Sequence, residues 1–249
     1  MANRIGVTNH NVFGDFYFSM AENRVNTLRH SLGLLNHGIV LSNYGYNAHQ
    51  YLVNELDHLL VSLLNERIIV WVNEVTWEYR KMCHEFGGVV VDLDRCSDIP
   101  YDKKIIVIVS PISSTDKRRC FEKLMNALTK MPFEYTAVRT YLYVESLDSL
   151  FRADQEHKDN ALLEMIENII KGSRRKKIVF TGFMALPFSQ IYTHNYHRLF
   201  MHSAYLLVAG DVSSYDASEI SELCGIPPRK IFNHCSVNEI TMLWGRPKL

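Results

Sequence analysis

The chain has 249 residues, 47% hydrophobic and 22% charged, which is enough to bury the core of one α/β domain. Its 27 basic and 27 acidic residues give a formal net charge of zero, which excludes a global attraction to nucleic acid or to an anionic membrane. Five cysteines without a C-x-x-C pair predict free thiols in a reducing compartment, and no apolar run reaches the roughly 18 to 20 residues of a membrane span. We therefore expect a cytoplasmic protein that reaches the inner face of a membrane only through its partners.

Short apolar segments alternate with longer amphipathic ones, a pattern typical of an α/β fold with a mainly parallel sheet flanked by helices. The predicted strands are 38–42, 67–73, 88–93, 104–110, 139–145, 177–182, 204–210 and 239–244. The predicted helices are 47–65, 76–86, 115–130, 155–172, 187–202 and 214–224.

Residues 1–36 lack such a period and are expected to form an N-terminal arm or a small appended segment, whereas residues 37–249 form a single lobe. The aromatic stretch FGDFYF at 13–18 has no obvious place inside a compact lobe. We interpret it as a segment that docks on another protein.

The stretch SNYGYNAH follows the first predicted strand and opens a helix, which is where a phosphate-binding loop would lie. Such a loop uses glycines for close backbone approach, a Lys for the phosphates and a hydroxyl for magnesium. Here only Gly45 is in place, Ala48 stands at the Lys position and His49 stands at the hydroxyl position. The complete vestigial loop comprises Ser42, Asn43, Tyr44, Gly45, Tyr46, Asn47, Ala48 and His49.

The stretch RIIVWVNEVTWEYRKMCHEFGG begins with the next predicted strand. An acidic turn follows this strand, and after the turn come a helix and a glycine pair. This arrangement resembles the conjugation ATPases of type IV secretion systems, the VirB/TraC type, and the related HerA-like P-loop proteins. Glu74 stands at the position of an Asp in the family's second-strand turn, and Glu78 matches its Glu. Gly87 and Gly88 match the glycine pair.

The segment RTYLYVESLDSLF resembles the family's Walker B strand, whose Asp supports magnesium and whose Glu polarises the attacking water. Glu145 stands at the Asp position, and Ser146, which cannot act as a base, stands at the Glu position. In KIVFTG, Gly182 stands where active members carry a sensor Gln. No catalytic residue and no metal ligand is predicted.

The resemblance covers about residues 36–249 and implies a RecA-like ATPase-type domain with a degenerate P-loop. The substitutions predict a catalytically inactive scaffold or regulatory subunit of a mobile-element DNA-transfer apparatus rather than an enzyme. Its implied partners are an active paralogous ATPase, further copies of itself, or secretion-apparatus proteins. The resemblance implies ATP with magnesium as the ligand, whereas the substitutions argue against the binding of this ligand by the chain.

Two other interpretations stay open. One is an unconventional nucleotide hydrolase in which Glu145 supports magnesium. The other is an unrelated Rossmann-like module that binds proteins and has no affinity for nucleotide.

Overall fold

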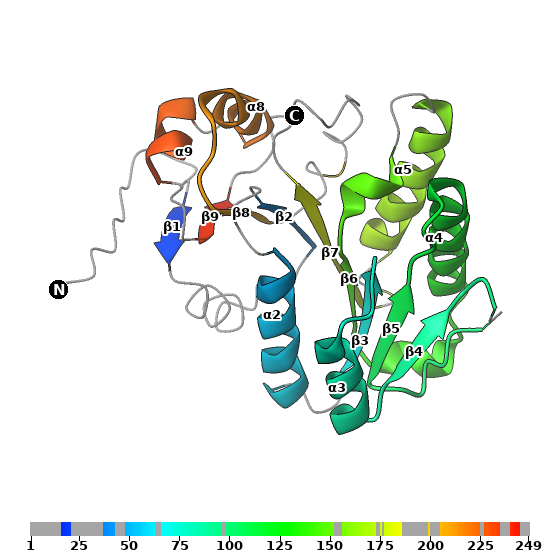
Figure 1. The fold of residues 1–249 in the computed structure, drawn as a ribbon. Helices are drawn as coiled ribbons and strands as arrows, with labels where there is room; N and C mark the ends of the chain where they lie inside the picture. The colour runs from blue at the N-terminus through cyan, green and yellow to red at the C-terminus, as the bar shows by residue number, and fades with distance from the viewer. Residues whose placement is uncertain are drawn as a thin grey trace. The chain divides into compact units, whose positions relative to one another are not determined.

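The computed structural model describes residues 16–20, 37–42, 48–62, 66–95, 98–151, 156–172, 175, 177–185, 199, 205–224, 227–234 and 240–244 (Figure 1). The chain forms two compact units. The first unit contains the residues up to Ala48 and from Met184 onward, and the second contains His49–Phe183. The described helices include none that is long and apolar enough to cross a bilayer.

The second unit is built on five parallel strands that pair in the order β7, β6, β3, β5 and β4. These strands are β3 (Arg67–Val72), β4 (Val89–Asp92), β5 (Ile105–Val109), β6 (Thr140–Val144) and β7 (Ile178–Ala185). Their near-continuous Ile, Val and Leu runs suit a parallel sheet that is buried on both faces. Trp71, in the central strand β3, lies opposite Ile108 of β5 and Val144 of β6 and is completely buried.

Among the described residues, four α-helices and two short 3-10 helices accompany this sheet. They are α2 (Ala48–Ser62), α3 (Trp77–Phe86), α4 (Ser114–Thr129), η1 (Phe133–Ala137), η2 (Leu147–Leu150) and α5 (Glu156–Lys171). On α2, Leu52, Leu56 and Leu59 recur at helical spacing and are buried. On α4, Phe121 packs edge-on against Trp71, with the ring centroids 5.2 Å apart.

The first unit combines one parallel and two antiparallel strand pairs. Strand β2 (Gly38–Ser42) runs parallel to β8 (Tyr205–Ala209). Strand β9 (Ile240–Trp244) runs antiparallel to β8 on one side and to β1 (Phe16–Met20) on the other. Two helices, α8 (Ser214–Cys224) and α9 (Pro228–His234), follow β8 in the chain.

The structure confirms the α/β fold with a mainly parallel sheet flanked by helices. All eight predicted strands are present, and five of the six predicted helices are found. The sixth prediction, 187–202, lies almost entirely outside the described residues. Strand β1 and helix α9 were not predicted. Phe16–Phe18 of the aromatic stretch belong to β1 and pair with β9, so these residues do have a place in the fold, whereas their docking on another protein stays a prediction.

The two glycines between α3 and β4 serve different structural purposes. Gly87 ends α3 with φ +69°, the left-handed conformation that favours glycine at the end of a helix. Gly88 has ordinary φ but lies against the neighbouring strand, because a Cβ there would lie 2.6 Å from the backbone oxygen of Ile105. The pair therefore ends the helix and lets the chain approach β5 closely.

Because the two glycines serve different purposes, we expect their substitutions to lower the free energy of unfolding by different amounts. We expect Gly87→Ala to lower the free energy of unfolding by about 1 kcal/mol, because only the backbone conformation is strained. Gly88→Ala should cost at least about 3 kcal/mol, because the clash with a backbone atom cannot be relieved by a rotamer change. Urea unfolding of the two variants measures the difference, and equal costs would contradict this account.

Arg67 begins β3 and is a buried cation held by neutral groups. Only 4% of the residue is exposed. Its Nε donates to the Tyr101 carbonyl at 2.7 Å, and its Nη1 donates to the Tyr135 carbonyl at 3.2 Å and to Thr140 Oγ1 at 3.0 Å. The guanidinium also lies 5.5 and 5.6 Å from the ring centroids of Tyr101 and Tyr135. Arg67 thereby ties the start of β3 to the loop before β5, to η1 and to β6.

Replacing Arg67 should destabilise the second unit strongly. Arg67→Met removes the hydrogen bonds to the Tyr101 and Tyr135 carbonyls and to Thr140 Oγ1, so we expect the free energy of unfolding in urea to fall by about 3 kcal/mol. Arg67→Lys should recover only part of this, because an ammonium lacks the planar fork of the guanidinium. Arg95→Met, at a side chain that is 86% exposed, is the matched control and should change stability by less than about 0.5 kcal/mol.

Candidate polar site at the carboxyl ends of the parallel strands

A group of polar side chains gathers where β3 and β6 end in the second unit. The two strands are adjacent and parallel, with Trp71 opposite Val144, so Asn73 and Glu145 emerge side by side. The carboxyl edge of a parallel sheet is where ligands bind in open α/β folds. His49, Lys117 and Ser149 reach the same place from α2, α4 and η2.

Both carboxylate oxygens of Glu145 are occupied by protein donors. Its Oε1 lies 3.1 Å from His49 Nδ1, and its Oε2 accepts a hydrogen bond from the Asn73 backbone N–H at 3.2 Å. Because a carboxylate only accepts, the His49 Nδ1 carries the hydrogen in this contact. The two side chains are partly buried, with 29% of His49 and 18% of Glu145 exposed. The contact joins the two residues that the sequence resemblance placed at the hydroxyl position of the loop and at the Walker B Asp position.

An aromatic residue of α3 fixes the orientation of His49. The His49 and Tyr79 rings meet edge to face with their centroids 5.4 Å apart, and Tyr79 is completely buried. Burial raises the pKa of Tyr79 well above its usual range, and the charges of Glu145 and Glu78 raise it further. Tyr79 is therefore a neutral wall of the site.

Asn73 connects Glu145 to a second set of polar groups. Its Nδ2 donates to Ser146 Oγ at 2.8 Å, and its Oδ1 accepts from Lys117 Nζ at 2.9 Å. Lys117 Nζ also donates to Ser149 Oγ at 3.3 Å, and Ser149 Oγ donates to the Ser146 carbonyl at 2.7 Å. Burial lowers the pKa of Lys117, whereas the charge of Asp148 raises it.

Ser146 adopts a backbone conformation that is uncommon outside glycine. Its φ and ψ are both 55°, in the left-handed region. Such a conformation costs free energy and persists where surrounding contacts hold it. Here the contacts come from Asn73 and Ser149. The turn after β6 is therefore held in one shape by the polar network.

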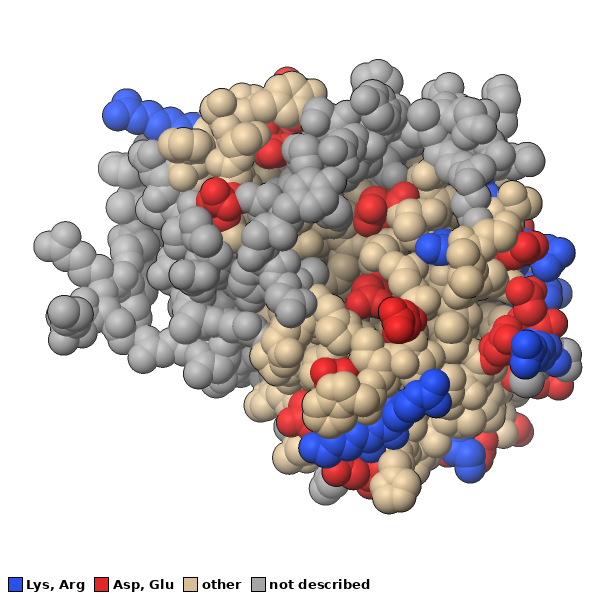
Figure 2. Space-filling view, in the orientation of Figure 1, with Lys and Arg blue, Asp and Glu red and all other residues tan. Residues whose placement is uncertain are grey.

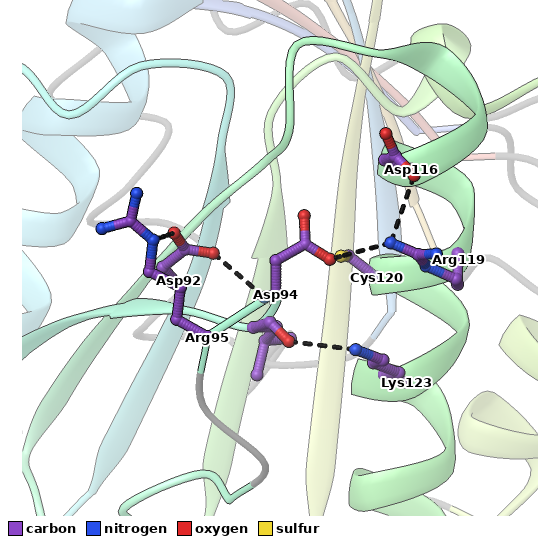
Figure 3. A network of polar contacts seen from close by, with 8 residues as sticks. Asp92, Asp94, Arg95, Asp116, Arg119, Cys120 and Lys123 are labelled. Carbon is purple, nitrogen blue, oxygen red and sulfur yellow. Dashed lines mark hydrogen bonds and ion pairs between the residues drawn. The ribbon is translucent and has the colours of Figure 1, made fainter.

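A second network fixes α4, the helix that carries Lys117, to the loop after β4 (Figure 3). Asp94 Oδ1 accepts from Arg119 Nη2 at 3.2 Å and from Cys120 Sγ at 3.0 Å. Lys123 Nζ donates to the Leu93 carbonyl at 3.2 Å. These contacts come from two successive turns of α4 and hold the helix against the loop after β4.

This second network predicts that Cys120 is chemically inert in the folded protein. Burial and the neighbouring Asp94 carboxylate raise the pKa of Cys120 to about 12, and the residue has no exposed surface. Because the thiolate is the reactive form, we expect iodoacetamide at pH 8 to label Cys120 only after denaturation. Mass spectrometry of the Cys120 peptide measures this.

Asp94→Asn distinguishes the two causes of this protection. If burial dominates, the variant stays protected from iodoacetamide. Rapid labelling of Cys120 in the native wild-type chain would contradict the described packing of α4.

The structure brings together only some of the site residues proposed from the sequence. His49 and Glu145 are in contact, and Ser146 lies beside them. Glu74 is exposed just beyond β3, and Glu78 is on the first turn of α3. Of the loop, Ser42 ends β2 and Ala48 begins α2, whereas Asn43, Tyr44, Gly45, Tyr46 and Asn47 lie outside the described residues. Within the described part of the chain, no group of three His, Cys, Asp or Glu side chains could hold a metal ion.

The sequence interpretation missed Asn73, Lys117 and Ser149. Asn73 carried a usable signal, since it is the first polar residue after a buried strand, on the edge where ligands bind. Lys117 lies in the basic segment KRRC, where nothing in the sequence separates it from its neighbours. Its role depends on the packing of α4.

No family model matches the chain, and no curated protein matches it either. Solved structures do resemble it. The genome packaging NTPase B204 of Sulfolobus turreted icosahedral virus 2, in complex with AMPPCP, matches with a TM-score of 0.57 and 13% identity over 86% of this chain and 99% of that one. VirB4 of Thermoanaerobacter pseudethanolicus matches with a TM-score of 0.60 and 10% identity over 86% and 89%. The chain therefore has the RecA-like fold that these proteins share.

Proposed function

We propose that this chain is a non-hydrolysing relative of the DNA-transfer ATPases and acts as a scaffold or regulatory subunit of a type IV secretion apparatus. The proposed partners are an active paralogous ATPase, apparatus proteins or further copies of the chain. Through them the protein would lie at the inner face of a membrane. The fold it shares with VirB4 and with the packaging NTPase supports this class of function.

The observation that carries the proposal is the occupation of Glu145. A carboxylate at this position in a nucleotide hydrolase must be available to support magnesium. Here one oxygen faces His49 and the other faces the Asn73 N–H. A metal ion would have to displace protein donors that are already positioned and partly buried.

The neighbouring substitutions support the same conclusion. Ala48 has no cation for the phosphates, and Ser146 cannot polarise a water molecule. Gly182, opposite Val144 at the end of the β6–β7 pair, has no side chain that could sense a nucleotide. All of these changes remove groups that act on one reaction, and such groups act as a unit.

The surface charges fit a protein-binding role. On the face shown in Figure 2, basic side chains of the described residues lie next to acidic ones, with one short run of basic side chains low on that face. Extended contact with a nucleic-acid backbone requires many cations on one surface.

Phosphate release from ATP with magnesium tests the proposal on the full-length chain. We expect the wild type to release no more phosphate than Glu145→Gln. Introducing both Ala48→Lys and His49→Thr, which returns a cation and a metal-binding hydroxyl, should not by itself restore turnover because Ser146 still lacks a carboxylate. Clear hydrolysis by the wild type that Glu145→Gln abolishes would overturn the proposal in favour of the unconventional nucleotide hydrolase.

A further inference from the structure

The outward face of α3 carries a stripe of basic and aromatic side chains. Because an α-helix has about 3.6 residues per turn, Arg80, His84, Trp77 and Lys81 follow one another around this helix. All four are exposed, and the opposite face carries the buried residues of the helix. Trp77 has 67% of its surface in solvent. The short run of basic side chains low on the face of Figure 2 lies over α3 of Figure 1.

The chain itself neutralises the cations of this α3 stripe only weakly. Lys81 Nζ lies 3.9 Å from Glu85 Oε1, and the two side chains are 56% and 47% exposed, so this ion pair contributes little. Among the described residues, no carboxylate forms an ion pair with Arg80 or His84. Lys81 Nζ also lies 6.0 Å from the centroid of the Trp77 ring. The stripe thus presents an aromatic ring beside cations that can accept a further partner.

Acidic side chains border the α3 stripe on one side only. Glu85 and Glu78 follow Lys81 around the helix, whereas the buried Cys83 follows Arg80 on the other side. A carboxylate of a ligand would be repelled at the border with the two glutamates. The border at Arg80 is therefore the place where an acidic group fits.

A protein fits this surface better than a nucleic acid does. Contact with a phosphate backbone needs many cations on one surface, and α3 holds two acidic residues beside its three basic ones. Glu74, just before the helix, is exposed as well. Tryptophan and arginine are enriched among the residues that dominate the binding energy of protein–protein interfaces. An arginine also recognises a carboxylate through two parallel hydrogen bonds.

We propose that the α3 stripe, formed by Arg80, His84, Trp77 and Lys81, is a docking surface for an acidic segment of a partner protein. A carboxylate of the segment pairs with the Arg80 guanidinium, and an apolar side chain covers the Trp77 ring. The inference goes beyond the proposed function by naming a surface and the chemistry of its partner. It rests on that function only in taking the partner to be a component of the apparatus.

Selection of a display library of random short peptides on the full-length chain, at low salt, tests this surface. We expect the enriched peptides to carry an excess of Asp and Glu together with an apolar residue. Fluorescence anisotropy of labelled synthetic copies then gives their dissociation constants. Arg80→Glu should weaken binding at least about tenfold because it reverses the charge that meets the carboxylate. Trp77→Ala should have an effect of about the same size because it removes the apolar anchor.

Lys130→Glu is the matched control for the charge reversal. It changes the net charge as much as Arg80→Glu does, at an exposed lysine that follows α4, and it should bind the peptides like the wild type. Arg80→Lys keeps the charge and loses the planar fork, so its affinity should lie between those of the wild type and Arg80→Glu. Because the substituted side chains are exposed, we expect all four variants to keep the urea midpoint of the wild type.

Three results would show the inference to be wrong. They are a selection that enriches no peptide, enriched peptides without an acidic excess, and acidic peptides that bind Arg80→Glu as tightly as the wild type. A labelled single-stranded oligothymidine is the competing probe. If it binds and the acidic peptides do not, and if Arg80→Glu abolishes its binding, the stripe belongs to nucleic acid instead. Phosphate release is measured in a separate assay, so failure of this inference and failure of the proposed function are distinguishable.

Discussion

The parallel pairing of β3 with β6 is the constraint on which the rest of the second unit depends. It aligns Trp71 with Val144, and the register carries the next residues of both strands to the same edge. The Asn73 N–H then meets the Glu145 carboxylate, and the Asn73 side chain meets Ser146. At the opposite edge, the same pairing places Arg67 beside Thr140. One register therefore determines both a buried structural cation and a partly exposed polar site.

Much of this fold could be predicted because buried parallel strands have a strong local signal. Runs such as RIIVWV and KIIVIV are apolar without alternation, and each is bounded by polar residues, so their existence and limits are visible in the chain. Strand β1 was missed for the opposite reason. Its five residues are a strand because they pair with β9, more than 200 residues away in the sequence. A short segment beside a long aperiodic stretch gives no local indication of such a partner.

The candidate site was only partly predictable. His49 and Glu145 were singled out by their positions relative to a known motif, but their contact spans 96 residues and follows from how α2 packs on the sheet. Lys117 and Ser149 could not be assigned from the sequence, because a lysine and a serine on exposed-looking segments are ordinary. Their significance comes from meeting at Asn73, which is a tertiary property.

The substitutions at this edge are more informative together than one by one. A lost catalytic group alone leaves a hole or an unpaired partner, and an unpaired, partly buried carboxylate is costly. Here His49 supplies a donor to the Glu145 carboxylate. The turn after β6 is supported in the same way, since Asn73 and Ser149 hold the left-handed Ser146. The polar contacts at this edge therefore support one another, because the donor to Glu145 and the support of the Ser146 turn both pass through Asn73.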